Sequence, residues 1–213
     1  MLRRQFLYSS VALLGGINLC NSAIFSKKRS KVCGVHTVKR SSTSPPKWGY
    51  NHLTYYMAGR DTGDMKKAEW DHQWRLAFGS WSKVSPLTFD RTNNSKTADI
   101  LIDVSRDKDE GFGRRLDILA WAELPSISDW QWQLVTKFDK SEEWVTEIEN
   151  EKRDILLQNV AAHEIGHLLG LDHSTYEYAL MFPYYDPAIN IPQPIDDILR
   201  IQTLYGEPNA NYK

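Results

Sequence analysis

The chain has 213 residues, of which 41% are hydrophobic and 25% charged, and this suits one globular domain with short appendages. The formal net charge of −1 is unevenly distributed, because residues 1–60 hold ten of the twenty-six Lys and Arg and no Asp or Glu. The remaining residues carry a formal charge of −11, sixteen basic against twenty-seven acidic side chains. A body this acidic repels phosphates, so we expect no nucleic acid as a partner.

The first residues have the pattern of a secretory signal peptide. Arg3 and Arg4 precede an apolar run from Phe6 to Ile17, and small or polar residues follow it. This run is shorter than the about 20 apolar residues that cross a bilayer, so we expect no stable membrane insertion. We assign residues 1–22 to a signal peptide, whose arginine pair also suits the twin-arginine type, and expect a secreted or extracytoplasmic protein.

Residues 23–45 are rich in Ser, Lys, Arg and Pro, a composition that cannot bury a core. Two compatible interpretations are a solvated linker behind the export signal and a short basic pro-segment attracted to the acidic body. If the signal is cleaved after Cys20, the mature chain keeps a single cysteine, Cys33, which cannot form an internal disulfide.

Residues 46–207 have the apolar strand-like and helix-like segments expected of a folded domain, and a tail follows at residues 208–213. Apolar runs predict strands at residues 53–57, 98–104 and 116–122, and helical spacing predicts helices at residues 64–82, 151–169 and 196–205. Asp64 is expected to cap the first helix, and Gly170 to end the second. Strands interspersed with long helices predict an α+β fold, an α/β sandwich.

The stretch from His163 to His173, HEIGHLLGLDH, has the spacing of a metal site. On a helix, His163 and His167 lie one turn apart, so both imidazoles can reach one ion. Gly170 can adopt the left-handed conformation that ends the helix and brings His173 over as a third ligand. Three neutral nitrogens leave a fourth position open to water, which is the arrangement of catalytic zinc.

Glu164 lies beside the first expected ligand, where its carboxylate can reach a zinc-bound water without binding the metal. Zinc lowers the pKa of such a water to about 7, and Glu164 can take its proton as general base and later act as proton donor. The His-Glu-x-x-His pentad alone would also suit an ordinary helix surface. The extended motif, with a third His and a Gly in defined roles, favours the catalytic interpretation.

The long motif followed by a Met resembles the metzincin zinc endopeptidases, and Ser174 after the third His resembles their matrix metalloproteinase (matrixin) family. The resemblance implies a metzincin-like catalytic domain with a twisted mixed sheet, an active-site helix, a Met-turn and a C-terminal helix. It also implies a secreted zinc metalloendopeptidase that acts on proteins or peptides, and we expect a monomer.

The same resemblance implies roles for residues outside the motif. Met181 would lie in a Met-turn as a hydrophobic floor beneath the zinc. The edge strand, where substrate adds as an antiparallel strand, would include Leu119 and Ala120. The pocket for the residue after the scissile bond would be lined by Pro183, Tyr185 and, near its floor, Asn159.

One departure from the family and two partial matches to it bear on the metal sites. Trp121 and Lys137 stand where two ligands of the family's structural zinc would be, so we expect one catalytic zinc only. Asp139 and Glu142 match a calcium-binding segment, although a plain acidic surface explains them equally well. Cys33 begins a Cys-Gly-Val segment that resembles the core of the family's inhibitory cysteine motif.

A Cys33 thiolate would be a good fourth ligand for zinc and would displace the catalytic water, with cleavage at Lys39 or Arg40 expected to release it. The alternative is an incidental free cysteine. Two rivals to the whole reading remain open: a catalytically inactive zinc-binding or adhesion module, and a metzincin of another subfamily.

Overall fold

The computed structural model describes residues 32–36, 47–59, 65–108, 112, 118–125, 133–150 and 154–209. The expected signal peptide, most of the pro-segment and the last residues of the tail lie outside these ranges. None of the helices within them is both long and apolar enough to cross a membrane.

Six strands form the main sheet, in the spatial order β1-β5-β6-β4-β2-β3. Their bounds are β1 Val32–His36, β2 His52–Met57, β3 Thr88–Arg91, β4 Ile100–Ser105, β5 Ile118–Glu123 and β6 Leu134–Asp139. All neighbouring pairs are parallel except β5 and β6, which are antiparallel, so the sheet is mixed. A small second sheet pairs β7 (Glu143–Val145) with β8 (Asp154–Leu156).

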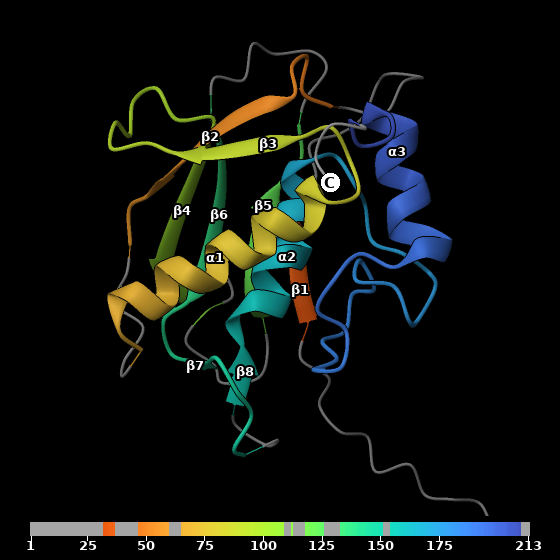
Figure 1. Cartoon of the computed structure of the whole chain (residues 1–213). Coiled ribbons are helices and arrows are strands. Elements are labelled where there is room, and N and C mark those ends of the chain that lie inside the picture. The colour runs from red at the N-terminus through yellow and green to blue at the C-terminus, as the bar shows by residue number, and fades with distance from the viewer. Residues whose placement is uncertain are drawn as a thin grey trace, which may run out of the picture.

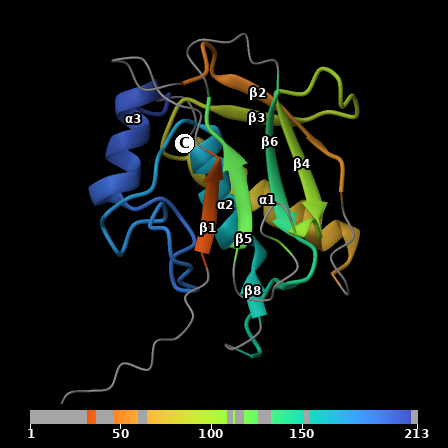
Figure 2. The same cartoon turned by 180° about the vertical axis from the view of Figure 1, so that it is seen from behind.

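Two long helices, α1 (Lys67–Ser82) and α2 (Leu157–Leu168), pack on the same face of the main sheet. Seen from behind, the strands lie in front of both helices (Figure 2). The core between them contains three fully buried tryptophans of α1, Trp70, Trp74 and Trp81. The Trp81 indole N–H donates a 2.8 Å hydrogen bond to the carbonyl of Ala162, which ties α1 to α2. The expected α+β fold is confirmed.

The expected helix at residues 151–169 begins later than predicted. Asp154–Leu156 pairs with β7 as a strand, and α2 starts at Leu157. The Asp154 carboxylate accepts hydrogen bonds from the backbone N–H groups of Glu149 and Asn150, which tie the start of β8 to these two residues. Apolar periodicity alone could not separate this short strand from the helix that follows it.

The predicted cap of the first helix is also wrong. The helix begins at Lys67 with Lys66 as the N-cap, and the Lys66 backbone N–H donates to the carboxylate of Glu69. Glu69 in the first turn therefore bonds the backbone of the N-cap residue, as in half of a capping box, and Asp64 lies outside the described residues.

The C-terminal helix has two parts, a π-helical turn at Pro194–Ile198 and then α3 at Leu199–Tyr205. The wider turn follows from the hydrogen bond between the Ile198 N–H and the Gln193 carbonyl, five residues earlier. Ile201 and Leu204 are buried, as the sequence predicted. Figure 1 shows α3 standing beside the α1–α2 pair.

Candidate active site

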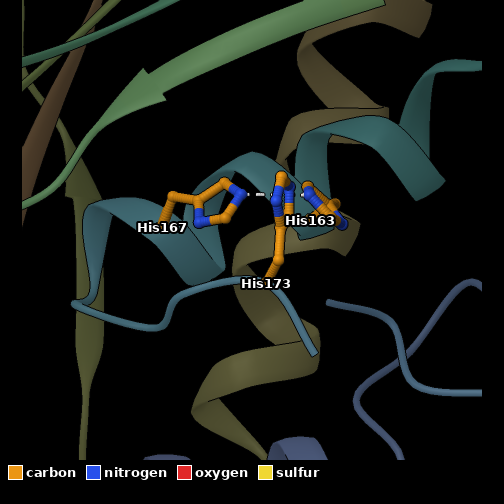
Figure 3. Close-up of side chains that lie close together, drawn as sticks. All are labelled: His163, His167 and His173. Carbon is orange, nitrogen blue, oxygen red and sulfur yellow. Dashed lines mark hydrogen bonds between the residues drawn. The ribbon is translucent and has the colours of Figure 1, made fainter. Parts of the chain in front are cut away.

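The three motif histidines come together at the C-terminal end of α2 (Figure 3). His163 and His167 project from the helix, and Gly170 ends it with a φ of 97°, the left-handed backbone expected there. The Leu171 N–H donates to the Gly166 carbonyl and closes the helix end. The chain then turns back and places His173 against the other two rings.

Hydrogen bonds orient the first two imidazoles. The Nδ1 atoms of His163 and His167 each lie 2.7 Å from a backbone carbonyl oxygen, that of Leu180 and that of Leu171 respectively. A carbonyl only accepts, so each Nδ1 carries the proton and each Nε2 presents a lone pair. These hydrogen bonds fix the tautomer in which Nε2 is free to bind a metal.

The unprotonated nitrogens fit a single zinc ion. The two Nε2 atoms of His163 and His167 lie 3.1 Å apart, close to the about 3.3 Å between two nitrogens on one tetrahedral zinc. The Nε2 of His173 is buried and has no hydrogen-bond partner among the described residues. The ligand atoms of the three side chains all lie within 4.8 Å of one another.

Burial keeps the three imidazoles neutral. It lowers the pKa of His163 to about 3, lowers that of His167 well below its usual value, and lowers that of His173 in the same direction. Because only neutral imidazole can bind a metal, the environment favours coordination over protonation.

Glu164 is fully buried beside the histidines, and neither of its carboxylate oxygens meets a well-placed hydrogen-bond donor among the described residues. Burial raises the pKa of this carboxyl well above its usual range, an effect that the adjacent Cys33 thiol opposes. A buried carboxyl next to a metal-binding cluster can exchange protons with a group held there.

Met181 packs against α2, the helix that carries His163 and His167. It is fully buried, and a Cβ at Gly166 would collide with its sulfur atom, so only glycine lets the helix approach so closely. The Asp197 carboxylate accepts hydrogen bonds from the N–H groups of Leu180 and Met181. Because Leu180 also accepts from His163, this turn supports the metal site as well as its floor.

A pocket opens beside His163 between α2 and the segment after Met181. Tyr185 and Asn159 line it as expected: the Tyr185 hydroxyl accepts a hydrogen bond from the Leu156 N–H, and the Asn159 amide donates to the Pro187 carbonyl at 3.0 Å. Pro183 is not among its lining residues. The residues lining the pocket are Cys33, Asn159, Val160, His163, Ala179, Leu180, Phe182, Tyr184, Tyr185, Asp186 and Ile189.

The strand β1 lies along this site. It pairs in parallel with β5, the strand that contains Leu119 and Ala120, and the Cys33 N–H donates to the Pro183 carbonyl on the other side. The Cys33 side chain is buried, and its sulfur lies within 4.8 Å of ligand atoms of His163 and Glu164. Burial raises the pKa of the Cys33 thiol, and the Glu164 carboxyl adds to that shift.

The residues at the expected position of a second zinc contact one another. Trp121 and Lys137 are paired across β5 and β6, and the Lys137 ammonium lies 5.5 Å from the Trp121 ring centroid. Further along, Asp139 and Glu142 are both buried, and one Asp139 oxygen accepts hydrogen bonds from the N–H and hydroxyl of Ser141. Neither belongs to a cluster of three possible metal ligands within the described residues.

Sequence reasoning missed the supporting contacts of the site. It gave no role to Asp197 or to the carbonyls of Leu171 and Leu180, because these partners are backbone atoms or lie far along the chain. One signal was present: two adjacent acids, Asp196 and Asp197, interrupt an apolar segment, and one of them is fully buried.

Comparison with known proteins agrees with this geometry. A family model described as Peptidase_M10, matrixin, matches residues 47–206. The hatching enzyme of Paracentrotus lividus is 38% identical over 183 residues, 84% of this chain and 30% of that protein. The interstitial collagenase of Sus scrofa is 37% identical over 187 residues, and stromelysin-1 of Mus musculus is 36% identical over 190 residues; each alignment covers 84% of this chain and 37% of the relative. The chain thus spans about a third of the length of these relatives.

Proposed function

Because the chain belongs to the matrixin family, we propose that it is a zinc-dependent endopeptidase that hydrolyses peptide bonds in proteins or peptides. The observation that carries the proposal is the convergence of three neutral imidazoles next to a buried carboxyl. In this proposal, His163, His167 and His173 hold the zinc, and Glu164 acts on the attacking water.

Bound zinc supplies Lewis acidity and brings the pKa of a coordinated water to about 7. The other steps belong to the protein. The Glu164 carboxylate takes the proton of the attacking water and then passes it to the leaving amine, which avoids release of a free amide anion. The carbonyls of Leu171 and Leu180 keep two imidazoles in the tautomer that this arrangement requires.

The substrate would lie between β5 and the segment around Pro183. The β5 strand offers backbone groups at Leu119 and Ala120 for an antiparallel substrate strand, and the Pro183 carbonyl offers an acceptor on the opposite side. The pocket beside His163 would receive the side chain after the scissile bond. Its apolar and aromatic lining favours residues such as Leu, and the Asn159 amide sets a polar limit to its depth.

The position of β1 supports a latent form of the enzyme. In this form Cys33 provides the fourth zinc ligand, because its sulfur lies beside His163 and Glu164 and its N–H already uses the Pro183 carbonyl. The strand runs parallel to β5, opposite to the direction proposed for a substrate. A coordinated thiol is deprotonated, so zinc would overcome the effect of burial on the Cys33 pKa.

Several further features are part of the proposal. The chain would be secreted through residues 1–22, carry its pro-segment and linker at residues 23–45, and act as a monomer through the domain at residues 46–207. We propose one catalytic zinc, with calcium near Asp139 and Glu142 as an optional stabiliser. Trp121 and Lys137 support the absence of a second zinc, since they contact one another.

The test is peptide hydrolysis by the full chain after trypsin has cut at Lys39 or Arg40. Glu164→Gln should lose about a hundredfold or more of the activity while keeping the zinc content of the unaltered protein, because only the base is removed. Glu69→Gln makes the same chemical change at an exposed position of α1 and should keep both. A zinc-loaded but inactive unaltered protein would favour the non-catalytic binding module, and an active Glu164→Gln would refute the role of Glu164.

A further inference from the structure

The third histidine is held differently from the other two. His163 and His167 are fixed by a helix and by hydrogen bonds from their Nδ1 atoms. His173 lies in an irregular segment, is only half-buried, and has no ring hydrogen bond from the described residues. Its direction therefore depends on the backbone on either side of it.

Both neighbours of His173 are bound to the same pair of charged side chains. The Arg200 guanidinium donates a 2.7 Å hydrogen bond to the carbonyl of Asp172, just before the histidine. The hydroxyl of Ser174, just after it, donates a 2.7 Å hydrogen bond to the Asp196 carboxylate. Arg200 and Asp196 are themselves joined by a 3.0 Å ion pair, so the four residues form a bracket around the ligand.

The helix that carries Arg200 is anchored to the core and to α2. Arg200 belongs to α3, whose residues Ile201 and Leu204 are buried in the core. The Tyr205 hydroxyl donates a 2.9 Å hydrogen bond to the carbonyl of Leu169 at the end of α2. The helix that carries Arg200 is thereby tied to the helix that carries the first two histidines, and the bracket sets the third ligand relative to them.

From this arrangement we propose that Arg200 and Asp196 are positioning residues that hold His173 in the direction needed to bind zinc. The inference rests on the proposed three-histidine zinc site and adds to it the residues that complete the site. An arginine suits the task because its planar fork donates to two differently placed acceptors at once, here Asp196 and the Asp172 carbonyl. A lysine can replace the charge but not this double contact.

The test measures the rate at which zinc leaves the full chain in excess chelator. Residues that orient metal ligands typically contribute 10–100-fold to metal affinity, and Arg200→Met should release zinc about tenfold faster because His173 is no longer held from both sides. Arg200→Lys should fall between this variant and the unaltered protein. With cobalt in place of zinc, the visible spectrum of Arg200→Met should also shift, because the spectrum reports the geometry of the ligands.

Arg91→Met is the matched control, since Arg91 forms a comparable half-buried ion pair with Asp71 away from the histidines. It should lower the melting temperature as much as Arg200→Met does, without changing zinc release or the cobalt spectrum. If Arg200→Met does not fold, Ser174→Ala cuts the other side of the bracket and should give the same accelerated release.

Zinc release and a cobalt spectrum unchanged in Arg200→Met would overturn the inference, as would equal acceleration in Arg91→Met. An unaltered protein that binds no zinc would instead refute the three-histidine site itself, so the two failures can be told apart.

Discussion

The histidine cluster and the β5–β6 region both contain buried polar side chains, but the contacts of these side chains differ between the two regions. At the cluster, the Nε2 of His173 and both carboxylate oxygens of Glu164 have no well-placed hydrogen-bond partner among the described residues. In the β5–β6 region, Lys137 lies over the ring of Trp121, and Asp139 accepts two hydrogen bonds from Ser141.

This difference indicates where a metal is needed. Burial of a polar atom without a partner costs roughly 1–3 kcal/mol, and a bound ion is one way in which a fold offsets that cost. The cluster collects three such atoms on two neighbouring side chains, whereas Lys137 and Asp139 in the β5–β6 region contact side chains of their own region. Trp121 and Lys137, at the positions where the sequence resemblance would place ligands of a second zinc, form a cation–π contact with one another.

Substitution of Cys33 gives the largest expected change, because in the proposed latent form its thiolate is the fourth zinc ligand. Cys33→Ser should raise the activity of the uncut chain by roughly tenfold or more, since each 1.4 kcal/mol lost from the closed form changes the ratio of closed to open forms tenfold. Peptide hydrolysis before and after trypsin measures this. Equal activity of the two uncut proteins would reduce Cys33 to an incidental thiol.

The packing beneath the histidine cluster should tolerate an added methyl group less well than the packing around α1. In Gly166→Ala the new methyl group would meet the Met181 sulfur and the Trp81 ring, and overpacking of this kind costs about 1–3 kcal/mol. Gly79→Ala is the matched control on α1, where nothing lies within 4 Å, and it should stabilise the helix by about 0.5–1 kcal/mol. Urea unfolding of both variants gives the comparison, and a harmless Gly166→Ala would show that Met181 can move aside.

The smallest effect is expected in the β5–β6 region. Lys137→Met should lower the stability by about 0.5–1 kcal/mol through loss of the cation–π contact with Trp121, and leave one zinc per chain. Lys96→Met, on an exposed lysine, should change neither quantity. Metal analysis after dialysis measures the zinc content, and thermal unfolding measures the stability. Two tightly held zinc ions in the unaltered protein would contradict the absence of a second zinc site in this region.

Local chemistry made the centre of the site predictable. A spacing of four residues on a helix places His163 beside His167, and glycine is the residue that most readily adopts the left-handed backbone seen at Gly170. The start of α2 was not predictable in the same way, because Asp154–Leu156 has the apolar character of a helix and becomes a strand only by pairing with β7.

Contacts between distant residues account for what the sequence did not reveal. Arg200 reaches the Asp172 carbonyl across twenty-eight residues, and β1 joins β5 far along the chain. No local pattern marks such partners. Cys33 was predicted from a resemblance to a short motif, but the pairing of its whole strand along the cleft, parallel to β5, required the fold.

The most direct test of the account is the zinc X-ray absorption spectrum of the uncut chain and of the chain after trypsin. The account predicts three nitrogens at about 2.0–2.1 Å and one sulfur at about 2.3 Å before cleavage, with oxygen replacing the sulfur afterwards as activity appears. Zinc with no sulfur in the uncut chain would contradict closure of the site by Cys33, and a spectrum without histidine nitrogens would contradict the three-histidine site.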